Sequence, residues 1–345
     1  MKKKIFISIF AFFAICSFAF IFFFSPFPKT SVKNETVSRI EVPNGMSVKN
    51  LAAILQNEKI IKNKTAFYLF ARFKIFRNIF FLPDLHLESG VYHLKSSMSL
   101  REIFSLLSSG KQEYISLIFP EGFTISKIAK KLESANICSE NDFVQATKNK
   151  TLIESFNVDV NTLEGFLFPD TYFFMPNMTA EKVVSMMVQN FFLHVNEIPF
   201  FKTATKKEFY DTVILASIVE REYRIADEAP LIASVFKNRL KNNVGLYSCA
   251  TVEYIITEIQ GKAHPEIITY EDLKIDNPYN TYKWRGLPPA PISNPGMTAL
   301  KAASETPVTS YNYFRLIDVE KGKHTFSENF GEHIREGYSI KTKKE

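Results

Sequence analysis

The chain has 345 residues, 46% of them hydrophobic and 23% charged, which is the composition of a globular protein large enough for about two domains. The formal net charge is +6, three of these charges are the lysines at positions 2–4, and no basic stripe with interleaved aromatic residues follows, which argues against nucleic acid as a partner. The six histidines show no HExxH-like spacing and no GxSxG sequence occurs, so we expect no metal site, no cofactor and no serine nucleophile.

The N-terminal lysines are followed by an uncharged apolar stretch, residues 5–24, which a Ser-Pro pair ends. A helix of this length spans roughly 30 Å, about the hydrocarbon core of one bilayer. A cleaved signal peptide has a shorter apolar stretch and a small-residue cleavage site, so we favour an uncleaved anchor. By the positive-inside rule residues 1–4 are then cytoplasmic, and residues 25–37 form a tether to the part outside the membrane.

Two segments of the first half resemble each other at an offset of 77 residues: "IEVPNGMSVKNLAAILQNEKII" from Ile40 and "LIFPEGFTISKIAKKLESANIC" from Leu117. Each pattern predicts a strand, a Pro-x-Gly turn, a Ser or Thr N-cap and an amphipathic helix. A glycine-led aromatic strand and another helix follow each of them, at "SGVYHLKSSMSLREIFSLL" and "EGFLFPDTYFFMPNMTAEKVVSMM". We interpret the pattern as a duplicated α+β unit, which either binds an extended polymer or is a scaffold duplication.

Two cysteines lie beyond the apolar stretch, Cys138 and Cys249, while Cys16 lies inside it. Cys138 and Cys249 are therefore the two that could pair in an oxidising compartment. The alternative is a pair of unpaired buried thiols.

"LASIVEREY", residues 215–223, places two glutamates at the end of an apolar helical pattern. Positions two apart on a helix point about 200° apart, so Glu220 and Glu222 face different ways and do not form a catalytic pair on one face. One can ionise in a salt bridge with Arg221 or Arg224 while the other stays in an apolar cleft, where a carboxylic acid has a raised pKa and can donate a proton near neutrality. The alternative is two ordinary ion-paired glutamates at a helix end.

"DNPYNTYKWRGLPPAPISNPGMTALKAASE" is a long loop that leads into an Ala-rich helix. Aromatic faces stack on sugar rings, and amides and hydroxyls pair with sugar hydroxyls, so the loop suits a saccharide. The side chains that carry this interpretation are Tyr279, Asn280, Tyr282, Trp284, Ser293 and Asn294. The alternative is a structural wrap. "YNYFRLIDVEKGKHTFSENFGEHI" then predicts two strands around a turn, with His324 in the second.

Five segments in this order resemble the YceG-like endolytic murein transglycosylases: "LEGFLFPDTYFF", "LASIVEREY", "SVFKNRLKNNVGLYSCATVEY", "NPYNTYKWRGLPPAPISNPG" and "HTFSENFGEH". The resemblance runs from about residue 38 to residue 335. Any one of these segments alone would be a weak signal, whereas their common order is specific.

The resemblance implies a lyase that cuts peptidoglycan glycan strands between N-acetylmuramic acid and N-acetylglucosamine and leaves 1,6-anhydro-muramic ends. It places the family's catalytic glutamate on Glu220, with Glu222 and Ser217 in supporting roles. One acid suffices, because the sugar's own 6-hydroxyl replaces water: the acid protonates the glycosidic oxygen and then, as a base, takes the proton of that hydroxyl. The candidate substrate-binding residues are Tyr279, Asn280, Thr281, Tyr282, Ser293, Asn294 and His324.

The implied architecture is α+β, with a LysM-like module at residues 38–118 and a mixed α+β catalytic domain at residues 119–340, behind the N-terminal transmembrane helix. The implied location is the inner membrane of a bacterium, with a single pass and the catalytic domain on the periplasmic side. The implied partners are nascent glycan strands, whose elongation the enzyme would terminate, and peptidoglycan synthases of the penicillin-binding type.

Two positions depart from the family pattern. The family's "LQSDPTVxY" is here "LYSCATVEY", with Cys249 and Ala250 in place of Asp-Pro, and "GLPPGPI" is "GLPPAPI", with Ala290. An acidic group near the site is lost, which favours an alternative: a catalytically weak scaffold that binds glycan strands and recruits synthases. The retained Glu220 favours the enzyme.

Overall fold

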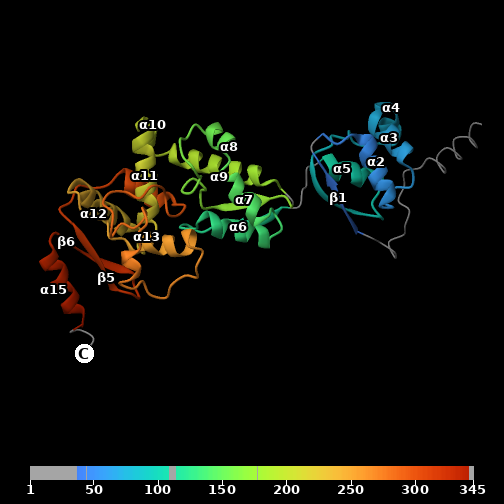
Figure 1. Cartoon of the computed structure of the whole chain (residues 1–345). Coiled ribbons are helices and arrows are strands. Elements are labelled where there is room, and N and C mark those ends of the chain that lie inside the picture. The colour runs from blue at the N-terminus through green and yellow to red at the C-terminus, as the bar shows by residue number, and fades with distance from the viewer. Residues whose placement is uncertain (1–36, 44, 109–113, 177, 342–345) are drawn as a thin grey trace, which may run out of the picture. The chain divides into compact units, whose positions relative to one another are not determined.

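The computed structural model describes residues 37–341, apart from residues 44, 109–113 and 177. The predicted anchor, residues 5–24, lies outside this part, and among the described residues no helix combines the length and apolarity that crossing a bilayer requires. The chain divides into two compact units, Met1–Ile115 and Ser116–Glu345, which we call unit 1 and unit 2 and describe separately (Figure 1).

Unit 1 is a small α+β module. Its strands β1 (Val37–Val42) and β2 (Gly90–Lys95) pair antiparallel, with Val37 opposite Lys95 and Val42 opposite Gly90. Alternate residues of the strands face inward, as the two-residue period of a strand requires. The helices are α2 (Val48–Asn57), α3 (Lys64–Arg72), α4 (Lys74–Ile79) and α5 (Leu100–Ser108). The core between strands and helices is built from large buried side chains, among them Leu51, Leu55, Phe67, Tyr92, Phe104 and Leu107.

The predicted duplication is present as a repeated order of elements. Strand β3 (Ile115–Ile118), a turn and helix α6 (Ile125–Ser134) repeat the order of β1, a turn and α2. In both turns the glycine is left-handed, with φ of 81° at Gly45 and 74° at Gly122, a conformation that side chains with a Cβ rarely adopt. Both helices begin with a hydroxyl N-cap, Ser47 and Thr124, as expected from the sequence.

The second copy continues inside unit 2. After α7 (Glu140–Ala146) and α8 (Lys150–Ser155), strand β4 (Thr171–Phe174) pairs with β3, and α9 (Ala180–Val195) follows. The order strand, helix, strand, helix thus occurs in both units, and the mixed α+β architecture predicted from the sequence is confirmed. The identity of unit 1 as a LysM-like module stays a prediction.

The rest of unit 2 is mainly helical and surrounds α11 (Lys206–Val219). Every residue from Thr212 to Val219 is buried, because neighbours cover all sides of this helix. Helices α12 (Ala229–Lys241) and α14 (Met297–Ser304) pack against it. The shorter elements are α10 (Pro199–Thr203), η2 (Ala226–Glu228), α13 (Cys249–Tyr254), the π-helical turn η3 (Ile255–Ile259) and η4 (Asp272–Lys274).

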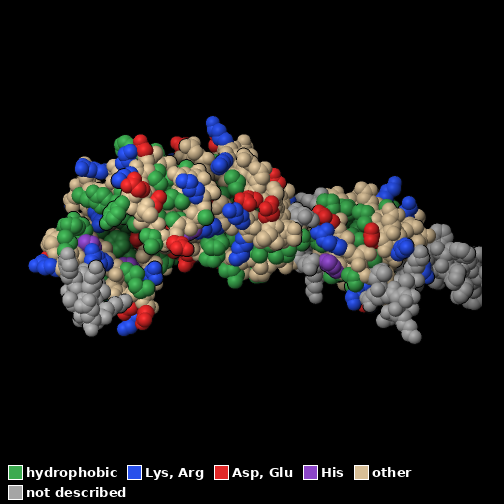
Figure 2. Space-filling model, turned by 60° about the horizontal axis from the view of Figure 1, so that its bottom comes forward, with side chains coloured by type: hydrophobic (Ala, Val, Ile, Leu, Met, Phe, Trp, Pro, Cys, Tyr) green, Lys and Arg blue, Asp and Glu red, His purple; other side chains and the backbone are tan. Residues whose placement is uncertain are grey.

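The C-terminal part forms the predicted hairpin. Strands β5 (Tyr313–Asp318) and β6 (Lys323–Ser327) pair antiparallel, and α15 (Phe330–Lys341) lies beside them (Figure 1). On the face shown in Figure 2, acidic and basic side chains are interspersed over unit 2.

Cys138 and Cys249 are both free thiols, so the pairing considered from the sequence is wrong. Neither thiol is fully buried, since Cys138 is half-buried and Cys249 is exposed.

Candidate active site

Glu220 lies where α11 ends, at the C-cap position, and is partly exposed. Its carboxylate accepts a hydrogen bond of 2.9 Å from the backbone amide of Gly296, at the start of α14, and another from the hydroxyl of Tyr223. Burial raises the pKa of Glu220 to about 7, with a further contribution from the negative charge of Glu121, while the Gly296 amide opposes the rise. The side chain is therefore an acid that exchanges its proton near neutrality, in contact with the end of the Asn/Tyr-rich loop.

A turn from the second α+β copy lies against this carboxylate. A Cβ added at Gly122 would lie 3.7 Å from Cγ of Glu220 and 3.4 Å from Cδ of Arg221, so the turn is in van der Waals contact with the end of α11. The next carboxylate, Glu121, lies over Gly296: its Oε1 is only 2.3 Å from where a Cβ of residue 296 would be. Neither Glu121 nor Gly296 is among the site residues predicted from the sequence.

Glu222 points to a different set of partners, as expected, but it lies in the turn beyond α11 rather than on the helix. It accepts a hydrogen bond from the hydroxyl of Ser248, and burial raises its pKa to about 7, against the opposing effects of Ser248, Arg239 and Arg221. Glu222 thus connects the end of α11 to the segment before α13, which supports its assignment to a supporting role rather than to proton transfer at the Glu220 site.

The expected ion pair of Arg221 with one of the two glutamates is wrong. The Arg221 guanidinium instead contacts Glu253 of α13 at 2.5 Å, and His264 contacts the same carboxylate oxygen at 3.1 Å. Arg221 also donates to the carbonyl of Gly122 at 3.4 Å. Burial nevertheless raises the pKa of both Glu220 and Glu222, although the positive charge of Arg221 opposes the rise.

Most polar side chains of the Asn/Tyr-rich loop are buried and hold the loop itself. Asn280 is fully buried and donates to the carbonyls of Leu273 and Ile275 at 3.0 and 2.8 Å. Thr281 contacts the hydroxyl of Thr251 at 2.9 Å and accepts from the amide of Ser248 at 3.1 Å. These contacts fix the loop conformation, so we interpret Asn280 and Thr281 as bracing residues rather than direct substrate ligands.

Ser217 and Ser293 join the same loop to α11. The hydroxyl of Ser217 accepts the amide of Ile292 at 3.0 Å, and the hydroxyl of Ser293 donates to the Ser217 carbonyl at 3.0 Å. Both serines are fully buried. Ser217 therefore supports the site through the loop backbone, one helical turn before Glu220.

Asn294 connects its own loop to the segment "LEGFLFPDTYFF" and to the Pro-x-Gly turn of the second α+β copy. Its side-chain oxygen accepts the amides of Gly165 and Leu167, both at 2.9 Å, and its amide donates to Glu164 at 2.8 Å and to the Phe123 carbonyl at 3.0 Å. Its own carbonyl accepts the amide of Gly122 at 2.9 Å. Asn294 thus holds the turn of the second α+β copy in place beside Glu220.

Among the predicted substrate-binding residues, Tyr279 and Tyr282 are the ones that remain partly exposed. The Tyr279 ring lies 5.2 Å from that of Tyr254, and the Tyr282 ring lies 5.6 Å from that of Tyr247. The hydroxyl of Tyr282 contacts the thiol of Cys249 at 3.1 Å, at the position where the family pattern has an acidic residue. Together with the exposed ring of Trp284, these rings are the flat surfaces that the loop offers to a sugar.

His324 lies on β6 and pairs with a residue of η2. Its Nδ1 is 2.7 Å from Glu228, and its backbone amide donates to the same carboxylate. The side chain is 7% exposed, so we interpret His324 as fastening the hairpin to the start of α12 rather than as a substrate ligand.

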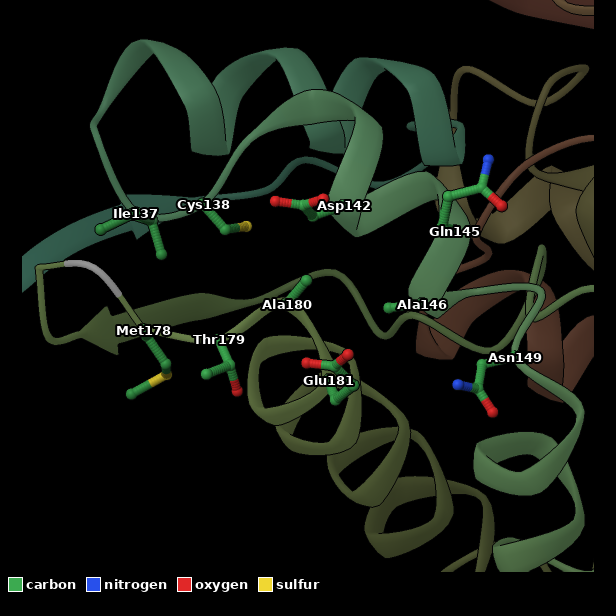
Figure 3. Close-up of a pocket in the computed structure, with 10 residues that line it drawn as sticks. All are labelled: Ile137, Cys138, Asp142, Gln145, Ala146, Asn149, Met178, Thr179, Ala180 and Glu181. Carbon is green, nitrogen blue, oxygen red and sulfur yellow. The ribbon is translucent and has the colours of Figure 1, made fainter. Parts of the chain in front are cut away.

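One cavity lies elsewhere, in the second α+β copy. It holds about 520 Å³ between α6–α7 and the β4–α9 connection, with Cys138, Asp142, Gln145 and Glu181 on its walls (Figure 3). No predicted site residue lines it.

Three comparisons with known proteins found similar sequences and a similar fold. The sequence profile of the YceG-like family matches residues 40–337. An endolytic murein transglycosylase of Bacillus subtilis (strain 168) is 31% identical over 316 residues, covering 87% of this chain and 84% of that protein. An endolytic murein transglycosylase of Streptococcus pneumoniae serotype 2 (strain D39 / NCTC 7466) is 30% identical over 342 residues, covering 90% of this chain and 59% of the pneumococcal protein. A crystal structure of a protein described as yceG-like from Listeria monocytogenes matches with a TM-score of 0.57 and 28% identity, over 88% of this chain and 99% of that one.

Proposed function

Because this chain belongs to the YceG-like family, we propose that it is an endolytic murein transglycosylase, a lyase that cuts glycan strands of peptidoglycan within the chain. The bond cut joins N-acetylmuramic acid to N-acetylglucosamine. The products are a strand ending in 1,6-anhydro-N-acetylmuramic acid and a strand with a free 4-hydroxyl on N-acetylglucosamine.

Glu220 carries both proton transfers in this proposal. Protonated Glu220 donates its proton to the glycosidic oxygen, the C1–O bond breaks, and positive charge develops on the muramic acid ring. The 6-hydroxyl of the same sugar then attacks C1, and the Glu220 carboxylate takes the hydroxyl proton. The cycle ends with Glu220 protonated again, and no water is consumed.

The surroundings of Glu220 suit both of its states. Burial favours the protonated acid that begins the reaction, since it raises the pKa of Glu220 to about 7. After the first transfer, the Gly296 amide at the N-terminus of α14 and the Tyr223 hydroxyl stabilise the carboxylate as hydrogen-bond donors. The single observation that carries the proposal is this partly exposed, readily protonated carboxylate at the end of α11, in contact with the end of the Asn/Tyr-rich loop.

Mass analysis of the products released from isolated peptidoglycan tests the proposal. We expect muropeptides that carry the 1,6-anhydro group, which are lighter by one water than the products of a hydrolase. In Glu220→Gln we expect product release to fall roughly 10²–10⁴-fold, the usual contribution of general acid–base catalysis. Glu197→Gln removes an exposed glutamate at the end of α9 and is the matched control. Reducing-end products, or a fully active Glu220→Gln variant, would contradict the assignment.

The membrane location is part of the proposal and rests on the sequence. Residues 5–24 are uncharged and long enough for one span, and the lysines before them favour a cytoplasmic N-terminus. Fractionation of the full chain, followed by protease treatment of intact spheroplasts, tests it. The prediction is a membrane-bound chain whose residues 38–340 are digested from outside.

Peptidoglycan synthases of the penicillin-binding type are proposed as partners because a strand-terminating enzyme acts where strands are made. Crosslinking in membranes, with and without the synthase, tests this association. The scaffold alternative differs in one outcome: it retains binding to glycan strands but yields no anhydro products.

A further inference from the structure

The feature of interest is the second carboxylate beside Glu220. Glu121 is the middle residue of the Pro-Glu-Gly turn between β3 and α6, and its Oε1, Cδ and Cγ lie 2.3, 2.7 and 2.6 Å from the place a Gly296 Cβ would take. Real Cβ atoms essentially never come so close to another heavy atom. Residue 296 is not forced to be glycine by its backbone, which has an extended φ of −85° and ψ of −178°. Its missing side chain is instead what allows the Glu121 carboxylate to lie there.

Gly296 therefore stands between two carboxylates. Its amide donates to Glu220 at 2.9 Å, while Glu121 packs over its Cα. In the part of the chain that the structure describes, no cation pairs with Glu121, and the cation nearest to the turn, Arg221, contacts Glu253. The negative charge of Glu121 is thus left to act on its neighbours.

The turn itself does not need this acid. In the sequence of the first α+β copy the matching residue is Asn44, and the glycine that follows has nearly the same φ, 81° at Gly45 against 74° at Gly122. Around Gly45 nothing lies within 4 Å of an added Cβ, whereas Gly122 contacts the end of α11. The copy that meets Glu220 is the copy that carries the carboxylate.

We propose that Glu121 is a positioning residue for the proton of Glu220: its negative charge, facing Glu220 across Gly296, keeps Glu220 in the acid form that starts the reaction. This inference rests on the proposed function. Glu121 is exposed in the free protein, so water screens its charge there. A bound glycan strand displaces that water and strengthens the repulsion between the two carboxylates.

The titratable groups that face Glu220 are few. Glu121 comes from the turn, Arg221 and Tyr223 come from its own segment, and α14 contributes the uncharged Gly296 amide. The Tyr223 hydroxyl is itself hydrogen-bonded by Thr298 of α14. Glu121 is the acidic neighbour in this set, so removing its charge has a predictable sign.

The test is the pH dependence of kcat for release of anhydro-muropeptides by the full chain, measured with saturating soluble glycan strands. In Glu121→Gln, which keeps the side-chain size, we expect the alkaline limb of kcat to move to lower pH by on the order of half a unit or more. The rate above neutrality then falls about threefold, and the rate near pH 5.5 is unchanged. Glu121→Asp keeps the charge, and we expect its limb to stay with the wild type. Glu197→Gln, which removes an exposed charge elsewhere, is the matched control.

The outcomes separate the inference from the function beneath it. A Glu121→Gln limb that superimposes on the wild-type limb, or a loss equal at every pH, overturns the role of Glu121. If Glu121→Gln fails to fold, Glu121→Asp is the test instead. The alkaline limb of its kcat profile must then match that of the wild type. Absence of anhydro products from the wild-type chain overturns the proposed function instead. The NMR titration of the Glu220 carboxyl carbon in wild type and Glu121→Gln gives a readout independent of turnover.

Discussion

The side-chain amide of Asn294 donates a hydrogen bond of 2.8 Å to the carboxylate of Glu164, across 130 residues of sequence. The same carboxylate accepts the amide of Ile125 in the first turn of α6. Glu164 is 3% exposed, and burial raises its pKa to about 8, although the Ile125 and Asn294 hydrogen bonds oppose the rise. A neutral carboxylic acid therefore lies at the junction of the second α+β copy and the loop that reaches Glu220.

Replacing Glu164 with Gln should weaken the pH dependence of stability. The pKa of Glu164 is about 8 in the folded chain, above its ordinary value of 4.5, so the folded state binds more protons between these values and loses stability as pH rises through them. Glu220 and Glu222 contribute with the same sign. Glu164→Gln should reduce the fall in the free energy of unfolding between pH 5 and 8 by roughly 2–4 kcal/mol. Urea unfolding at each pH measures it, and an unchanged slope would contradict it. The control is Glu154→Gln, on the surface of α8.

Truncation of Asn294 should destabilise unit 2. Asn294→Ala leaves the buried amides of Gly165 and Leu167 without their acceptor and removes donors to Phe123 and Glu164. We expect a loss of roughly 3–5 kcal/mol in the free energy of unfolding, because buried groups without partners cost more than the bonds themselves provide. Asn242→Ala, at an exposed asparagine, should change it by less than about 0.5 kcal/mol. Equal unfolding midpoints for the two variants would show that the Asn294 contacts are energetically unimportant.

Adding a methyl group at Gly296 should act through Glu121. The backbone at this position accepts alanine, and the exposed Glu121 side chain can rotate away from the new Cβ, so the fold should survive. We expect Gly296→Ala to shift the alkaline limb of kcat to lower pH, as Glu121→Gln does, because both remove the charge facing Glu220. The double variant should then shift it no further than either single change, a non-additivity that a double-mutant cycle measures. Gly331→Ala, on the exposed part of α15, is the control. Additive shifts would show that Gly296 and Glu121 act on Glu220 independently of each other.

The rate of the wild-type enzyme should fall above neutral pH. In the proposed mechanism protonated Glu220 begins the reaction, so kcat/KM should decline as pH rises through its pKa of about 7. In an enzyme that used ionised Glu220 from the start, the rate would instead rise over the same interval. Initial rates of anhydro-muropeptide release between pH 5 and 9 decide between these opposite signs.

Local pattern was enough to predict several features of this protein. The Pro-x-Gly turns with their hydroxyl N-caps and the hairpin around Gly322 follow from spacing within a few residues. Such features depend on backbone sterics and helical period, which act between near neighbours.

The roles of the polar loop residues could not be read in the same way. By chemistry alone, four loop residues are equally able to contact a sugar: Tyr279, Asn280, Ser293 and Asn294. The fold nevertheless buries Asn280, Ser293 and Asn294, which hold the loop in place, and leaves Tyr279 partly exposed. Burial depends on what packs against each side chain, and that is a property of the whole chain rather than of the loop.

The sequence by itself determined the α+β repeat and the family, and it predicted Glu220 as the acid, since the motif around Glu220 is contiguous. Only the tertiary structure decided that Arg221 forms its ion pair with Glu253. It also decided that Glu121, 99 residues before Glu220, lies beside Glu220. The physical reason is that an electric charge acts through space, and the distances between charges exist only once the turn after β3 has packed against the end of α11.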